Sequence, residues 1–204
     1  MFDHYPDFAA LTRHEHAERD WRRFCVERGS DVAIIAPHGG GIEAGTSELA
    51  RGIAGVELSL YCFEGIKRRG NQRLHVSSVR FDDPRCLRLL STARHALAVH
   101  GCAGRELAVH IGGADECLRA QMIEALRARG FEARADVSEE HRGRDPRNVC
   151  NRAGSGRGVQ LELTAGLRAT MFAGLRARER THITPAFTRF VDAVRGVALP
   201  YVGG

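Results

Sequence analysis

Short apolar runs alternate with amphipathic segments along most of the chain. Six segments have the character of β-strands: residues 31–37, 56–65, 73–81, 95–102, 106–113 and 159–163. Runs such as 31–37 and 95–102 are almost wholly apolar, as in strands that are buried on both faces of a sheet. The segments 56–65 and 73–81 alternate apolar and polar side chains, which is typical of strands with one exposed face.

Four segments have the periodicity and the end signals of helices: residues 46–54, 82–93, 114–130 and 184–199. An Asp cap followed by Pro84 predicts the start of the second helix, and Gly130 predicts the end of the third. The fourth carries Phe and Val residues at helical spacing. We expect it to pack on the rest of the chain as a C-terminal helix.

The alternation of strands and helices predicts a single α/β domain over residues 1–204, built on a mixed sheet. The first 30 residues are expected to be irregular and to end in a short helix. Residues 136–158 are polar and too long for a tight connection. Loops of that length in compact domains are usually functional.

The composition is that of an ordinary globular protein, with 204 residues and 43% apolar content. The chain opens with no signal-peptide pattern, and no apolar run reaches the roughly 18 residues of a membrane helix. We therefore expect a cytoplasmic, monomeric protein without membrane contact. The six cysteines are widely spaced and include no C-x-x-C pair, so we expect them to be reduced and mostly buried.

Positive charge is concentrated in the second half of the chain. Residues 119–180 contain 13 arginines against 8 acidic residues, an excess that equals the net charge of +5. The guanidinium fork is suited to carboxylate and phosphate groups, which favours an anionic ligand. A GC-rich gene explains the arginines equally well, because Lys67 is the only lysine.

Two histidines stand at the ends of predicted strands. His38 and His100 each follow an apolar run, and the carboxyl ends of parallel strands meet at one edge of a sheet. Glu43 follows His38 across the glycines 39–41, which allow the backbone to fold back on itself. Two histidines and one glutamate, with a fourth position open to water, are a ligand set of catalytic zinc. We therefore expect one Zn²⁺ per chain.

Each of these histidines also has a structural interpretation. His38 could cap the helix that follows it, and His100 could be a hydrogen-bonded core residue. His110 competes as the third ligand, although it lies inside its strand rather than at the end. Cys102 could bind zinc or act as a nucleophile, but no catalytic triad can be traced around it.

Water activation also needs a general base and a cation that holds the substrate. Glu162 is the only charge in the apolar strand 159–163, and a buried carboxylate is costly unless it is paired or functional. Its structural interpretation is an ion pair with an arginine such as Arg168. Asn151 and Arg152 could hold a substrate carboxylate through an amide donor and a guanidinium fork.

The strongest signal is a series of six blocks: PHGGGIEAGTSELA, SLYCFEG, LHVSSVRFDDP, AVHG, NVCNR and QLEL. In this order and spacing they resemble the phage-type poly-γ-glutamate hydrolases. The resemblance covers residues 32–168. It implies an open mixed β-sheet flanked by helices, similar to the zinc carboxypeptidases.

The resemblance also implies an activity, the zinc-dependent cleavage of γ-glutamyl amide bonds in poly-γ-glutamate. His38, Glu43 and His100 match the zinc ligands of this family. Glu162 matches the general base, which takes a proton from the attacking water and returns one to the leaving amine, while a nearby arginine helps to hold the oxyanion. A polymer with a carboxylate on every residue would account for the basic half of the chain, and its binding should weaken with salt.

The match of Asn151 and Arg152 to the carboxylate-binding pair of the wider carboxypeptidase group rests on a dipeptide alone. The chain also has extensions at both ends without a matched motif, which fit a bacterial or prophage copy with a shifted substrate. Lack of a secretion signal fits release at lysis or a cytoplasmic enzyme. Two alternatives remain open: a zinc deacylase or peptidase acting on a small acidic amide, and a basic nucleic-acid-binding domain, which the 6% aromatic content disfavours.

Overall fold

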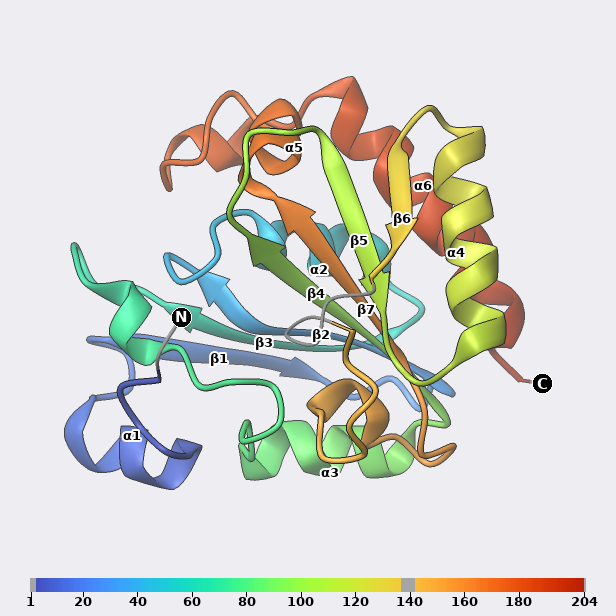
Figure 1. Ribbon diagram of the computed structural model, residues 1–204. Coiled ribbons are helices and arrows are strands. Elements are labelled where there is room, and N and C mark those ends of the chain that lie inside the picture. The colour runs from blue at the N-terminus through green and yellow to red at the C-terminus, as the bar shows by residue number, and fades with distance from the viewer. Residues whose placement is uncertain (1–2, 137–141, 204) are drawn as a thin grey trace.

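A single mixed β-sheet runs through the protein in the strand order β1-β3-β2-β4-β7-β5-β6 (Figure 1). The computed structural model describes residues 3–136 and 142–203. Its strands are β1 (Trp21–Val26), β2 (Val32–Gly40), β3 (Ser59–Gly65), β4 (His95–Cys102), β5 (Ala108–Gly112), β6 (Glu132–Ala135) and β7 (Val159–Thr164). The four central strands β3, β2, β4 and β7 are parallel, so their carboxyl ends meet at one edge.

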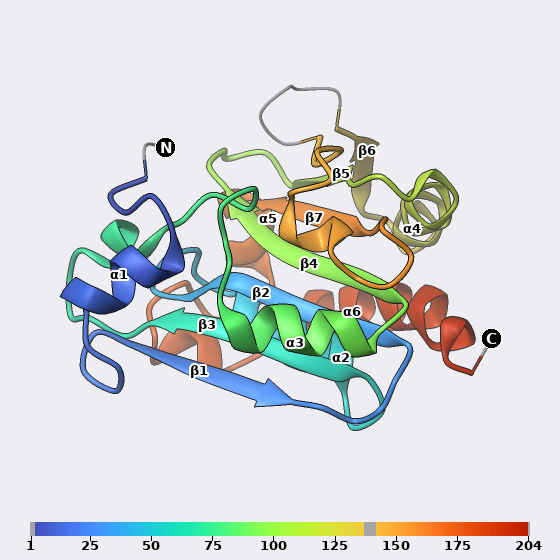
Figure 2. The ribbon, with the colours of Figure 1, turned by 90° about the horizontal axis from the view of Figure 1, so that it is seen from below.

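Helices cover both faces of the sheet (Figure 2). They are α1 (Phe8–His14), α2 (Thr46–Ala54), α3 (Pro84–Thr92), α4 (Glu116–Ala128), α5 (Ala165–Thr170) and α6 (Pro185–Ala198). Apolar side chains of α2, α4 and α6 form one core with one face of the sheet. Those of α1 and α3 form a second core with the other face. The predicted α/β fold with an open mixed sheet flanked by helices is confirmed.

Strand β7 lies between β4 and β5 in the sheet, although it comes long after both strands in the sequence. It pairs with β4 in parallel and with β5 antiparallel. The short connection from β4 to β5 therefore straddles the end of β7. Thr164 Oγ1 donates to the carbonyl of Glu106 at 2.5 Å, and the Gly166 amide donates to the carbonyl of Gly104 at 2.9 Å.

Most predicted elements agree with the structure, and the helix predicted over 46–54 has the same bounds as α2. The expectation for the first 30 residues was wrong. They contain α1 first and then β1, an edge strand antiparallel to β3. Because β1 is an edge strand, only Trp21 among its side chains is buried, and its arginines make ion pairs with neighbouring elements. An edge strand of this kind, with two adjacent arginines and only its first side chain buried, lacks the regular apolar alternation used for prediction.

The prediction of a strand over residues 73–81 was also wrong. This segment begins in the 3₁₀ helix Asn71–Leu74 and continues as an irregular stretch beside the sheet. Leu74 and Val76 are buried as the alternation required. The backbone of the stretch, however, is hydrogen-bonded by side chains, with His38 Nε2 at 2.8 Å from the Val76 carbonyl. The prediction also missed β6 and α5, and part of the predicted loop 136–158 lies outside the described residues.

Two further sequence expectations concern the cysteines and membrane contact. All six cysteines are free, and Cys62, Cys86 and Cys150 are buried while Cys117 is exposed. Among the helices of the described chain, none combines the length and apolar character required to span a bilayer.

Candidate active site

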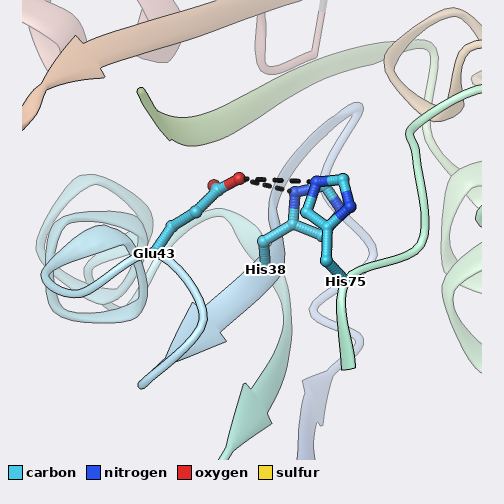
Figure 3. A group of neighbouring side chains, drawn as sticks. All are labelled: His38, Glu43 and His75. Atoms are coloured by element: carbon cyan, nitrogen blue, oxygen red, sulfur yellow. Dashed lines mark hydrogen bonds and ion pairs between the residues drawn. The ribbon is translucent and has the colours of Figure 1, made fainter. Parts of the chain in front are cut away.

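The glycines at the end of β2 and just after it reverse the chain so that Glu43 returns to His38. The Glu43 amide donates to the His38 carbonyl at 2.9 Å. Gly40 has φ +66, and a Cβ atom there would lie 2.5 Å from the carbonyl oxygen of Gly65. This position therefore requires glycine for its backbone angle and for the close approach of β3. As a result, Glu43 Oε1 lies 3.0 Å from His38 Nδ1 (Figure 3).

His100 on β4 completes a set of three converging donor atoms. Its Nδ1 lies 3.2 Å from His38 Nδ1 and 3.6 Å from Glu43 Oε2. Ligands at zinc-bond lengths in a tetrahedral site are about 3.3–3.4 Å apart. The two ring nitrogens, and each ring nitrogen with the nearer oxygen of Glu43, lie at separations close to this value, with His38 beside Oε1 and His100 beside Oε2. The Gly101 amide donates to Glu43 Oε2 at 2.8 Å and holds this carboxylate in place.

The outer nitrogens of the two rings are already engaged. His38 Nε2 donates to the Val76 carbonyl at 2.8 Å, which leaves the lone pair on its Nδ1. His100 Nε2 lies 3.4 Å from Ser78 Oγ. The Nδ1 atoms of the two rings lie 3.2 Å apart, and that of His38 carries a lone pair. Imidazole nitrogens beside a carboxylate form a donor set that fits a cation.

The site is buried and strongly polarised. Burial tends to raise the pKa of Glu43, but the adjacent His38 and His100 hold it well below its usual range. Burial tends to lower the pKa of His100, yet the carboxylates of Glu162 and Glu43 raise it. Each of the two rings is only 2% exposed. Glu43 therefore offers an ionised carboxylate beside two buried rings, which favours a divalent cation.

His75 also belongs to this cluster, although the sequence analysis did not single it out. Its ring packs on that of His38, with centroids 4.1 Å apart, and its Nε2 lies 3.9 Å from Glu43 Oε1 (Figure 3). His38, Glu43 and His75 alone could also hold a metal ion. Burial, and then the neighbouring His38, lower the pKa of His75 to about 4, so the ring is neutral at pH 7.

Glu162 stands beside the cluster in a row of side chains that crosses four strands. The pairing of β4, β7, β5 and β6 places these residues opposite one another: His100, Glu162, His110 and Arg134. Residues paired in this way point to the same face of a sheet. All four line a cavity of about 940 Å³ that also contains Glu43 and His75. The predicted base thus lies next to a predicted ligand, whereas His110 lies on its far side.

The surroundings of Glu162 bear on two alternatives raised by the sequence. One is an ion pair between Glu162 and Arg168, and the other is Cys102 as a nucleophile. The Arg168 guanidinium donates to the carbonyls of Leu163, Ala44 and Cys102 at 2.6–3.1 Å, so it ties three segments together behind the site. Gln160 Nε2 donates to Glu162 Oε1 at 3.3 Å. Burial and the charge of Glu162 raise the pKa of Cys102 to about 11. A thiol that stays protonated at neutral pH is a poor nucleophile.

Asn151 and Arg152 are not brought into the cavity. Asn151 is buried, and its amide nitrogen donates to the carbonyls of Gly143 and Asp145 at 2.7 and 2.9 Å. Its Oδ1 accepts from the Gly158 amide at 3.0 Å. Arg152 is exposed. Their role in carboxylate binding stays a prediction, while the geometry gives Asn151 the task of holding the loop before β7.

Comparisons with known proteins give the family of the chain. A family model described as poly-gamma-glutamate hydrolase matches residues 5–193. The UPF0714 protein YndL of Bacillus subtilis (strain 168) is 36% identical over 179 residues, which cover 87% of this chain and 70% of YndL.

Solved structures extend the similarity to the whole fold. A bacteriophage poly-gamma-glutamate hydrolase superposes with a TM-score of 0.94 at 30% identity and covers 98% of both chains. Zinc-free YndL superposes with a TM-score of 0.92 at 33% identity and covers 96% of this chain and 97% of the other. With a buried His and Glu cluster at the edge of such a sheet, and a family model that spans nearly its whole length, this chain belongs to the poly-gamma-glutamate hydrolase family.

Proposed function

We propose that the protein is a zinc-dependent hydrolase that cleaves the γ-glutamyl amide bonds of poly-γ-glutamate. One observation carries the proposal. The donor atoms of His38, Glu43 and His100 converge at 3.0–3.6 Å in a cavity that Glu162 also lines. Family membership supports the hydrolase class, and the zinc-free form of YndL supports zinc as the metal.

The proposed reaction is an attack of water on the amide carbonyl carbon. Bound by His38, Glu43 and His100, zinc would supply a Lewis acid that polarises the carbonyl and lowers the pKa of water to about 7. Glu162 accepts a proton from the attacking water as the new C–O bond forms. It then gives this proton to the leaving nitrogen as the C–N bond breaks.

The proposed substrate is an anionic polymer, and the cavity has a cationic side chain on its β6 side to receive it. Arg134 lies in the row beyond Glu162 and His110. The Arg134 side chain is 57% exposed and pairs with Glu132 at the surface, where a substrate carboxylate that enters from solvent can share its guanidinium. A carboxylate on each residue of the polymer would be attracted to this side of the cavity, and raised salt should weaken binding.

Replacing the proposed base tests the reaction. We expect Glu162→Gln to lower kcat on poly-γ-glutamate by roughly 10²–10⁴-fold, the range for loss of a general base, while the zinc content stays at one per chain. Glu57→Gln is the matched control, because Glu57 pairs with Arg195 far from the cavity. Full activity in Glu162→Gln would show that another group is the base.

The substrate and the metal need separate measurements. Long poly-γ-glutamate incubated with the zinc-loaded protein should become shorter on a gel. Unchanged polymer with intact zinc would overturn the polymer as substrate, in favour of a small acidic amide. His38→Ala should lose its zinc in metal analysis, and retention of a full equivalent would contradict the assigned ligands.

A further inference from the structure

A second side-chain pair points at the reacting centre from the side opposite Glu162. His75 Nδ1 lies 2.8 Å from Asp3 Oδ1, and the Asp3 carboxylate is only 3% exposed. The other oxygen of Asp3 accepts from the Ser77 amide at 3.0 Å and lies 3.4 Å from the Arg80 guanidinium. Asp3 is thus held in place by the Ser77 amide and the Arg80 guanidinium, and it holds His75 in turn.

This arrangement sets the tautomer of His75. The neutral ring carries one N–H, and the ionised carboxylate of Asp3 accepts only, so the hydrogen sits on Nδ1. The lone pair is then on Nε2, which faces the metal cluster within the cavity. Among the described residues no hydrogen bond reaches this nitrogen, since its nearest partner, Glu43 Oε1, is 3.9 Å away.

Sheet order places His75 and Glu162 on opposite flanks of the cluster. His75 packs on His38 of β2, whereas Glu162 belongs to β7, which lies beyond β4. An attacking water has two O–H bonds, and Glu162 accepts only one of these protons. The second O–H needs an acceptor on the other side if the oxygen lone pair is to face the carbonyl carbon.

Building on the proposed function, we propose that His75 is a further catalytic residue whose Nε2 accepts a hydrogen bond from the second O–H of the attacking water, with Asp3 as its positioning residue. The proton on this O–H is not transferred. The reaction therefore balances as before, with Glu162 moving the one proton that reaches the leaving amine.

The substitution Asp3→Asn tests the tautomer with almost no change in shape. Asparagine has one acceptor oxygen, and the backbone N–H of Ser77 requires it. The NH₂ group then faces His75 Nδ1 and can be accommodated only if Nδ1 carries the lone pair and Nε2 the hydrogen. The nitrogen facing the water thus changes from acceptor to donor.

The expected result separates catalysis from binding and folding. We expect Asp3→Asn to lower kcat by roughly 10–100-fold, as for one lost hydrogen bond to a reacting group, and to change KM less than about 3-fold. Zinc content should stay unchanged. In nitrogen-15 NMR spectra of the histidine-labelled protein, the Nε2 signal of His75 should move from the unprotonated to the protonated position.

A double-mutant cycle shows whether the two residues act as one unit. His75→Ala should lose as much activity as Asp3→Asn, and the double variant should lose no more than His75→Ala alone. His75→Gln, which keeps a polar acceptor, should recover part of the activity. If the activity losses of the two single variants multiply in the double variant, the proposal is overturned. An unchanged kcat in Asp3→Asn would overturn it as well.

Asp82→Asn is the control for the attachment of the N-terminal segment. Asp82 Oδ1 accepts from the Phe8 amide at 2.8 Å and lies outside the cavity. An equal loss of kcat in this variant would assign the effect to a detached segment and overturn the role of His75. If the wild-type protein cleaves no polymer, the proposed function fails, whereas the NMR signal of His75 still tests the tautomer.

Discussion

At the scale of single residues, Gly40 connects the backbone to the proposed metal site. Its positive φ and the 2.5 Å approach of the Gly65 carbonyl both depend on the missing side chain. The turn that follows brings Glu43 to His38. The carboxylate position is thus set by a residue that has no ligand atom of its own.

We expect Gly40→Val to weaken zinc binding at least about tenfold while leaving every ligand in the sequence. A β-branched residue at this φ is strained by roughly 1–3 kcal/mol, and the chain can escape only by moving the turn. Zinc affinity measured by competition with a chelator checks this. Gly130→Val is the matched control, because Gly130 has φ +82 with no atom within 4 Å. It should be destabilised without losing zinc affinity, and equal zinc loss in both variants would contradict the role of Gly40.

Residue-scale reasoning selected side chains that the structure brings together where they stand at a strand end. His38 and His100 follow apolar runs and Glu43 follows flexible glycines, and the three lie in one cluster, while their role as zinc ligands stays a prediction. Glu162 was found as a lone charge in an apolar strand. His75 was missed, because its role depends on Asp3, which is 72 residues away in the sequence. No local pattern contains such a contact.

At the scale of elements, one carboxylate on β3 joins β1 and α2 to the sheet. Glu64 Oε2 accepts from Arg22 Nε of β1 at 2.6 Å, and its Oε1 accepts from Arg51 of α2 at 2.7 Å. The Glu64 side chain is 4% exposed. Burial tends to raise the pKa of Glu64, but its pairing with Arg51 and then Arg22 lowers it below the ordinary value of 4.5.

We expect Glu64→Gln to lower the free energy of unfolding by about 1–3 kcal/mol at pH 7, because two charged hydrogen bonds are lost. Since the folded-state pKa is lowered, the contribution of Glu64 is fully present above the unfolded-state pKa. It disappears as the pH falls through the folded-state value. Urea unfolding at pH 7 and at a series of lower pH values measures both, and the difference between the two proteins should shrink as the pH falls below 4.5. A difference independent of pH would rule out the charge as the cause.

Element-scale prediction failed at the periphery of the sheet. The central strands are buried on both faces, and their apolar runs made them visible in the sequence. In β1, charged side chains pair with Glu64 and Asp83, so the strand is stabilised by contacts that its own pattern does not show. Over 73–81 the alternation was real, but side chains rather than a neighbouring strand satisfy the backbone near Val76 and Ser77.

At the scale of the whole molecule, metal binding should be coupled to the stability of the fold. The proposed ligands come from β2, the turn after it and β4, and they sit between the two cores. A ligand that binds only the folded state stabilises it by about 2.7 kcal/mol at a hundred times its Kd. For a chain of this length that corresponds to roughly 5–10 °C in Tm.

We therefore expect Tm to fall by about this amount when zinc is removed with a chelator, and to recover when zinc is added back. Differential scanning fluorimetry checks the shift. His38→Ala should show no response to either treatment. A wild-type Tm that is insensitive to zinc would contradict a metal site within the folded core.

The position of β7 has a consequence for biosynthesis. Until residues 159–164 have been synthesised, the edges of β4 and β5 that pair with β7 are both unpaired. Unpaired strand edges tend to pair with other chains. Shortened chains that end before this strand should therefore aggregate rather than persist as smaller folded units. Strand β7 also carries Glu162, so a nascent chain gathers its proposed metal ligands before it acquires its proposed base.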